Sequence, residues 1–195
     1  MSRSTSGFVT MCWLAGAAGV APSMAAVSEP DPVVVIKVEN PNGLQQRDLH
    51  RAQTLATDIY GRAGVALRWT PDQTTVPDRT LTIVLTTSTA APAALDRDAM
   101  GVAPSPGDGT RGTLAYVFLD KVTSFATSYR VGIAHVLACA LAHEIGHLLL
   151  PPNAHRTDSV MRGDWHPGIF PPRAPGIIGF PPEQAKLLRL RARRQ

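Results

Sequence analysis

The sequence predicts an α+β fold in which a twisted mixed β-sheet of four to five strands packs on a helix, with a further helix at the C-terminus. Short runs of β-branched residues recur along the first part of the chain, and a segment with helical spacing separates the first two runs. A long apolar helical segment follows them. At 195 residues, with 44% hydrophobic and 17% charged residues, the chain suits one globular domain with a proper core.

The predicted strands are short and rich in valine, isoleucine, leucine and threonine. A helix is predicted at Leu44 to Ala63, because its apolar residues recur at helical spacing and Gly64 fits a C-terminal stop. Ala90 to Gly112 is rich in alanine, proline and glycine and is predicted to be a loop. The predicted strands are Val33 to Glu39, Val65 to Thr70, Leu81 to Thr86 and Leu114 to Asp120.

The central helix is predicted from about Tyr129 to Leu149, with Thr127 or Ser128 as its N-cap. Two prolines, Pro151 and Pro152, end it, since proline lacks the N–H and forces its predecessor into an extended conformation. The chain is then predicted to form a loop from Arg162 to Pro182 and a last helix from Glu183 to about Arg193.

The N-terminus reads as a secretory signal peptide, residues 1–25, followed by a single domain at 26–195. Arg3 supplies a positive charge, and Phe8 to Val20 is apolar and uncharged but too short for a convincing membrane span. Ser23 and Ala25 place small residues at the −3 and −1 positions of a cleavage site. The mature protein is therefore expected to be secreted or periplasmic, without stable membrane association.

Cysteine content predicts no intramolecular disulfide in the mature protein. Cys12 would leave with the signal peptide, so Cys139 would be the only cysteine left. Its apolar surroundings predict a small buried hydrophobic residue rather than a nucleophile.

Charge gives no indication of a nucleic-acid partner. The formal net charge is +4, and much of the excess lies in the last residues, at Arg189, Arg191, Arg193 and Arg194. No aromatic residues are interleaved with these arginines, and a solvated helix end explains them.

The central helix carries the motif His143-Glu144-Ile145-Gly146-His147, an instance of H-E-x-x-H. Residues four apart lie on one face of a helix, so His143 and His147 can bind one Zn²⁺, at roughly 2.0–2.1 Å each. Glu144 would lie beside the metal, where it can take a proton from a zinc-bound water. The apolar flanks VLACALA and LLL predict burial on all faces, which makes these polar groups costly unless a metal satisfies them together.

A hydrolytic zinc site needs a third protein ligand and one open position for water. His155 follows His147 by eight residues, just beyond a short turn, and the chain reaches back to the helix easily. Asp158, Asp164 and His166 are alternatives. The remaining histidines of the mature chain, His50 and His135, carry no motif.

From Gly112 to Met161 the chain resembles the metzincins, zinc-dependent endopeptidases with the signature H-E-x-x-H-x-x-G-x-x-H followed by a Met-turn. In addition, Gly112 to Phe118 (GTLAYVF) is similar to the edge strand of matrixin-type members, where G-x-L-A-H-A-F is common. The order of elements agrees from about Val33 to Gln195. The resemblance implies a metzincin-like zincin fold, with a twisted mixed sheet above an active-site helix.

The resemblance also implies roles for individual residues. His143, His147 and His155 would bind one catalytic Zn²⁺, Glu144 would be the general base, and Met161 would form the floor below the metal. A peptide or protein substrate would bind as an extra strand along the edge strand, Leu114 to Phe118.

The chain departs from the family pattern after His147. The family's glycine falls at Leu150 and its third histidine at Asn153, whereas His155 comes two residues later, after Pro151 and Pro152. This loop therefore cannot have the family's usual geometry. Tyr116 stands where matrixins often place a structural-zinc histidine, so a second zinc is not implied.

The alternative function is a secreted zinc-binding domain that acts as a binding module without hydrolysis. The presence of Glu144 argues against it, because a purely structural zinc site needs no base and fills its fourth position with a protein ligand.

Overall fold

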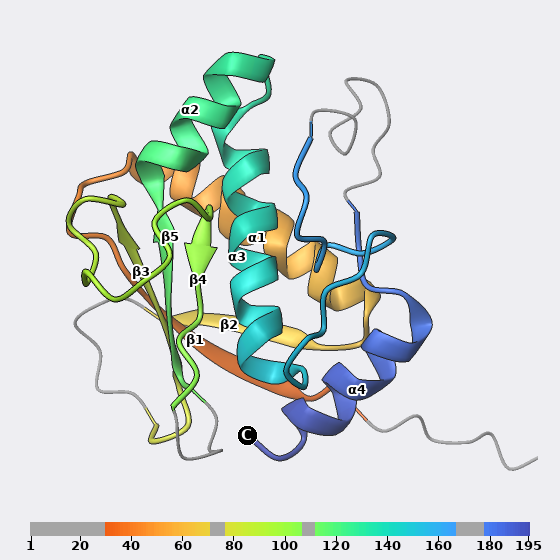
Figure 1. The fold of residues 1–195 in the computed structure, drawn as a ribbon. Helices are drawn as coiled ribbons and strands as arrows, with labels where there is room; N and C mark the ends of the chain where they lie inside the picture. Colours follow the sequence, from red (N-terminus) through yellow and green to blue (C-terminus); the bar gives the residue numbers. More distant parts are fainter. Residues whose placement is uncertain (1–29, 71–76, 107–111, 167–177) are drawn as a thin grey trace, which may run out of the picture.

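The computed structural model describes residues 30–70, 77–106, 112–166 and 178–195, so the predicted signal peptide lies outside the described residues. The structure contains each of the predicted strands and helices, in the predicted order, together with one short strand and one helix that were not predicted (Figure 1). In chain order the elements are β1 (Val33–Glu39), α1 (Gln46–Arg62), β2 (Ala66–Thr70), β3 (Leu81–Thr86), β4 (Gly101–Val102), β5 (Leu114–Phe118), α2 (Leu119–Tyr129), α3 (Ile133–Leu149) and α4 (Pro182–Ala192).

The sheet is mixed and has five strands in the order β2-β1-β3-β5-β4. The pairs β1–β2, β1–β3 and β3–β5 are parallel, and only β4 runs antiparallel to its neighbour, β5. The predicted fold, a mixed sheet of four to five strands packed on helices, is therefore confirmed.

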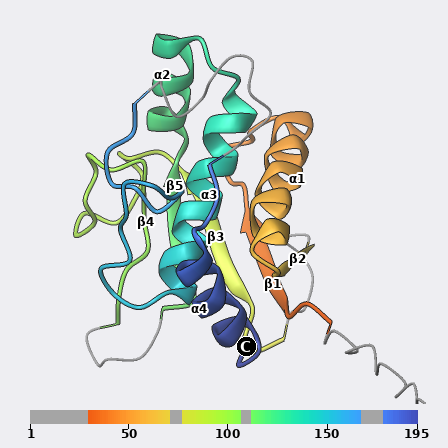
Figure 2. The ribbon, with the colours of Figure 1, turned by 90° about the vertical axis from the view of Figure 1, so that its right-hand side faces the viewer.

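Helices α1 and α3 pack on each other and on one face of this sheet (Figure 2). Burial alternates along β1, where Val34, Ile36 and Val38 are buried and the residues between them are not. This alternation is what a strand with one covered face requires. The two helices are also joined by a buried hydrogen bond, in which the Tyr60 hydroxyl of α1 donates to the Ala142 carbonyl of α3 at 3.0 Å.

Helix α3 is buried on nearly all sides, as its apolar flanks predicted. From Ala134 to Leu149 every residue is buried except His135 and His147. The helix contacts α1, α2, α4 and strands β3, β4 and β5. A helix enclosed in this way holds its side chains in fixed positions, because neighbours surround each of them.

Helix α2 was not predicted. The sequence predicted a strand to Asp120 and one helix from about Tyr129, whereas the strand ends at Phe118, α2 follows directly, and α3 begins only at Ile133. The buried residues of α2, Leu119, Val122 and Ala126, have the spacing of one helical face. The chain leaves α2 through Arg130, whose φ of 55° places it in the left-handed region and ends the helix.

The prediction that Leu114 to Phe118 is the edge strand is wrong, because β4 lies outside it. Gly101 pairs with Val117, and Val102 pairs with Tyr116. Strand β4 lies within the predicted loop Ala90 to Gly112. Two residues are too few to show an alternating pattern, and the pairing joins residues far apart in the sequence, so no local signal marks this strand.

Helix α4 confirms the predicted C-terminal helix and lies beside the end of α3 that follows the histidines (Figure 1). It is attached to α1 as well, since Arg189 Nη1 donates to the Ala63 carbonyl at 2.8 Å. Within the described part of the chain, none of the helices has both the length and the apolar character needed to cross a membrane.

Two adjacent leucines of α4 test how this helix docks. Leu188 is fully buried, whereas Leu187 is 38% exposed. We expect Leu188→Ala to lower the free energy of unfolding by about 2–5 kcal/mol, because it leaves a cavity in the core. The matched control Leu187→Ala should change it by no more than about 0.5 kcal/mol. Urea denaturation of both variants measures the difference, and equal losses would contradict the docking of α4 through Leu188.

Candidate metal centre

Three histidines converge beside helix α3. The Nε2 atoms of His143 and His147 lie 3.0 Å apart, and the Nε2 atom of His155 lies 3.1 Å from that of His147. One ring nitrogen from each histidine lies within 4.8 Å of the others. In the described part of the chain this is the one group of three or more histidine, cysteine, aspartate or glutamate side chains close enough to share a metal ion.

The turn between the helix and His155 explains the departure from the metzincin spacing. Leu150, at the family's glycine position, is extended and buried, with φ of −84°, so a side chain is tolerated there. The left-handed residue comes later, at Asn153, whose φ is 62°. Asparagine adopts this conformation more readily than most residues. His155 rather than residue 153 therefore reaches the other two histidines.

The ring of His143 is held by the backbone. Its Nδ1 atom lies 2.9 Å from the Val160 carbonyl oxygen, which can only accept a hydrogen bond. Nδ1 must therefore carry the proton, which leaves the lone pair of Nε2 facing the other histidines. Burial lowers the pKa of His143 to about 4, and burial with the neighbouring histidines lowers the pKa of His147 to about 4. Both rings are therefore neutral at physiological pH.

Glu144 is buried next to this cluster, with 4% of its surface exposed. Burial raises the pKa of its carboxyl to about 8. Among the described residues its Oε2 atom has no hydrogen-bond partner. A buried carboxyl oxygen in that state is costly unless a ligand or water occupies the space in front of it.

Strand β4 passes directly over Glu144. A Cβ atom added at Gly101 would lie 2.7 Å from Glu144 Oε1 and 2.7 Å from the Tyr116 carbonyl oxygen. Since real Cβ atoms do not approach so closely, glycine is required where the edge strand crosses the carboxyl. The sequence contained Gly101 but no signal for β4, so this residue was missed.

Met161, which the Met-turn resemblance implied as a floor below the metal, packs against helix α3 at Gly146. Its side chain is fully buried, and its Sδ atom would lie 2.3 Å from a Cβ added at Gly146. Gly146 stands between the two helix histidines, and its lack of a side chain lets the methionine pack against the helix there.

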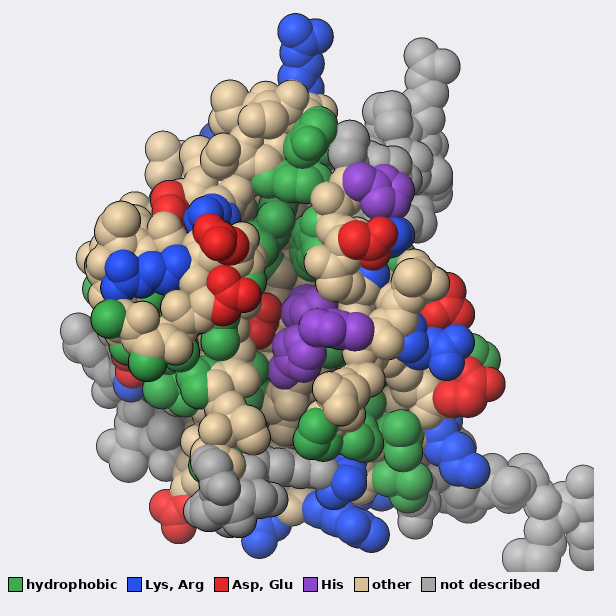
Figure 3. Space-filling model, viewed as in Figure 1, with side chains coloured by type: hydrophobic (Ala, Val, Ile, Leu, Met, Phe, Trp, Pro, Cys, Tyr) green, Lys and Arg blue, Asp and Glu red, His purple; other side chains and the backbone are tan. Residues whose placement is uncertain are grey.

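The cluster opens into a cavity of about 300 Å³. Figure 3 shows histidine side chains gathered in a hollow at the centre of one face of the molecule. Residues from three parts of the chain line the cavity: the segment around β4, helix α3 and the segment that follows α3. They are Asp96, Ala99, Met100, Gly101, Val102, Ala103, Ala140, His143, Glu144, His147, His155, Arg162, Gly163 and Trp165.

The alternative third ligands point elsewhere. Asp158 accepts two hydrogen bonds from Arg156, at 2.9 and 3.0 Å. Asp164 is paired with Arg162 at 3.1 Å. His166 is exposed, and none of the three belongs to the histidine cluster. The structure therefore brings together His143, His147 and His155, and leaves these alternatives outside.

Cys139 is buried in α3, and burial raises the pKa of its thiol to about 12. A thiol in that state is protonated at neutral pH and is a poor nucleophile. This agrees with its prediction as a small buried hydrophobic residue.

No protein-family model and no curated protein sequence matches this chain.

The raised pKa of Glu144 gives a prediction about the metal-free protein. Between pH 4.5 and 8 folded Glu144 keeps its proton while the unfolded chain loses it, so its contribution to stability falls as pH rises through this range. In excess chelator, Glu144→Gln should therefore gain stability relative to the natural protein between pH 5 and pH 8, by on the order of a few kcal/mol. Urea denaturation at both pH values measures this. The histidines are common to both proteins and should affect both equally. If the free energy of unfolding changed with pH in the same way in both, the raised pKa of Glu144 would be contradicted.

Proposed function

We propose that this protein is a zinc-dependent endopeptidase of metzincin type. The observation that carries the proposal is the convergence of three imidazole nitrogens beside a buried carboxyl, one oxygen of which has no hydrogen-bond partner among the described residues. Three histidines with an open fourth position are a donor set that zinc takes in hydrolases. The residues present therefore fit a catalytic zinc ion, with His143, His147 and His155 as its ligands.

When bound, zinc would supply a Lewis acid and a water molecule that loses its proton near neutral pH. Glu144 would accept that proton, because this residue lines the cavity together with His143. The same carboxyl would then deliver the proton to the leaving amine of a cleaved peptide. In the metal-free protein burial raises the pKa of Glu144, whereas a bound Zn²⁺ would favour the carboxylate, which is the form that can accept a proton.

The substrate is proposed to be an extended peptide or protein segment. Since β4 lies outside β5, the strand beside the cavity is β4 rather than Leu114 to Phe118. Met100 to Ala103 line the cavity, so a peptide added along β4 by main-chain hydrogen bonds would pass in front of Glu144. Glycine at 101 keeps this strand close to the carboxyl.

The first test separates metal binding from hydrolysis. Glu144→Gln should keep one zinc ion per chain and lose peptide hydrolysis by at least about 100-fold, because the general base is lost while the ligands remain. His155→Ala should lower zinc affinity sharply and remove activity, whereas the control His166→Ala should leave both unchanged. Metal analysis and digestion of a peptide library measure the two properties.

The outcomes decide between two classes of protein. Undiminished cleavage by the Glu144→Gln variant would contradict the role of Glu144. Tight zinc binding by the natural protein, without cleavage of any peptide in the library, would instead support a non-catalytic zinc-binding module.

The proposed location is outside the cytoplasm, either secreted or periplasmic, and rests on the apolar N-terminal segment and the small residues before Ala26. Mass spectrometry of the exported protein should show an N-terminus near Ala26 or Val27. Recovery of only full-length chain from the membrane fraction would contradict this.

A further inference from the structure

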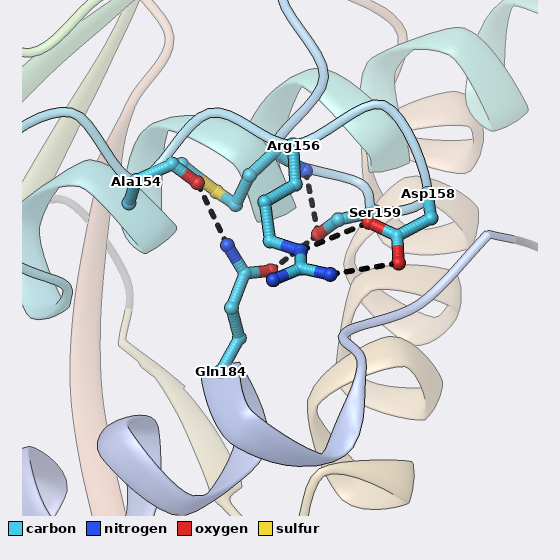
Figure 4. Close-up of polar contacts among 6 residues, drawn as sticks. Ala154, Arg156, Asp158, Ser159 and Gln184 are labelled. Carbon is cyan, nitrogen blue, oxygen red and sulfur yellow. Dashed lines mark hydrogen bonds and ion pairs between the residues drawn. The ribbon is translucent and has the colours of Figure 1, made fainter.

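Gln184 is a buried glutamine in the first turn of α4. Only 5% of its surface is exposed. Its side chain points away from α4 into the loop of residues 154–161, which we term the return loop (Figure 4). Neither the H-E-x-x-H motif nor the metzincin resemblance singles out this residue.

The amide of Gln184 joins the two ends of the return loop. Its Nε2 atom donates to the Ala154 carbonyl at 2.7 Å, and its Oε1 atom accepts from the Ser159 hydroxyl at 2.5 Å. Ser159 Oγ in turn accepts from the backbone N–H of Met161 at 3.1 Å. One side chain therefore fixes the residue before His155 and the backbone of Met161 at the same time.

The return loop carries two features of the metal centre. It contains His155, the third histidine of the cluster. It also contains Val160, whose carbonyl accepts from His143 Nδ1 and so fixes the orientation of that ring. Gln184 forms hydrogen bonds with Ala154 and Ser159 of this loop and, among the described residues, with neither imidazole. Groups that orient metal ligands in this way commonly change metal affinity 10–100-fold when they are removed.

Other interactions of the return loop hold it less firmly. The Arg156–Asp158 ion pair is about half exposed on both sides, and exposed pairs contribute little. Among the described residues the loop also has backbone hydrogen bonds from Arg156 N–H to the Met161 carbonyl at 3.2 Å, from Val160 N–H to the Gly179 carbonyl at 2.9 Å, and from Arg162 N–H to the Ser159 carbonyl at 3.1 Å. None of these attaches the start of the loop, next to His155, to the rest of the protein. The bond from Gln184 to Ala154 does so.

We propose that Gln184 is a positioning residue of the metal centre, which holds the return loop so that His155 and Val160 reach their places beside α3. The proposal rests on the metal site of the proposed function. Gln184 is a polar residue at a buried position of α4. Its two hydrogen bonds to the return loop explain why an amide is found there instead of an apolar side chain of similar size.

The main test is Gln184→Met, which keeps the length of the side chain but removes both hydrogen bonds. The matched control is Gln46→Met, at the exposed start of α1. Zinc affinity and zinc release are measured by competition with a chromophoric chelator. The visible spectrum of the cobalt-substituted protein reports the ligand geometry, and urea denaturation in chelator reports the stability of the metal-free fold.

Gln184→Met should weaken zinc binding about 10–100-fold, speed zinc release and alter the cobalt spectrum. Gln46→Met should change none of these. If Gln184 only stabilises the fold, the variant will unfold at lower urea, while the folded fraction keeps the zinc affinity and cobalt spectrum of the natural protein. That result would overturn the proposal.

A second variant covers the case in which Gln184→Met fails to fold. Gln184→Glu can still accept from Ser159, and above the pKa of the new carboxyl, where the carboxylate cannot donate to the Ala154 carbonyl, it should also weaken zinc binding and alter the cobalt spectrum. Unchanged zinc affinity and spectrum in that variant would contradict the proposal. Failure of the natural protein to bind zinc would contradict the proposed function. Normal zinc binding by the Gln184 variants would contradict only the positioning role of Gln184.

Discussion

The structure depends on one constraint: α3 is enclosed by other elements on nearly every face and still carries polar groups at its centre. An enclosed helix must be apolar where it meets the sheet and α1, and most of α3 is. His143 and Glu144 are the exceptions, and both are buried. Burial keeps His143 neutral and raises the pKa of Glu144, so the enclosure of the helix sets the protonation of the site.

The groups that satisfy this polar centre come from outside the helix. Val160 accepts the Nδ1 hydrogen of His143, and His155 approaches His147 from the same loop. That loop is tied by Gln184 to α4, which packs on the core through Leu188. The C-terminal helix therefore belongs to the site as well as to the fold, although none of its residues lines the cavity.

The spacing after the H-E-x-x-H motif shows how a loop can differ from the metzincin pattern and still deliver a histidine. A family glycine is not needed at Leu150, because that residue is extended. Asn153 has a left-handed conformation, which asparagine adopts more readily than most residues, and Pro151 and Pro152 end the helix before the turn. The cluster requires that the third imidazole lie beside His143 and His147, and here a loop two residues longer than in the metzincin pattern brings His155 to that position.

Local patterns in the sequence predicted most of the strands and helices and the part of the site that lies on α3. The limits of β1 and β3, the burial of α3, and the shared face of His143 and His147 follow from spacing and side-chain type alone, since these are properties of neighbouring residues. The sequence also favoured His155 as the third member of the cluster, while leaving Asp158, Asp164 and His166 open. Only the tertiary structure brought His155, and none of these three, beside His143 and His147, because that convergence depends on how the loop folds back. It alone also revealed β4, the need for glycine at 101 and the contacts of Gln184, because each of these joins residues distant in the chain, and such pairings leave no periodic signal in a single sequence.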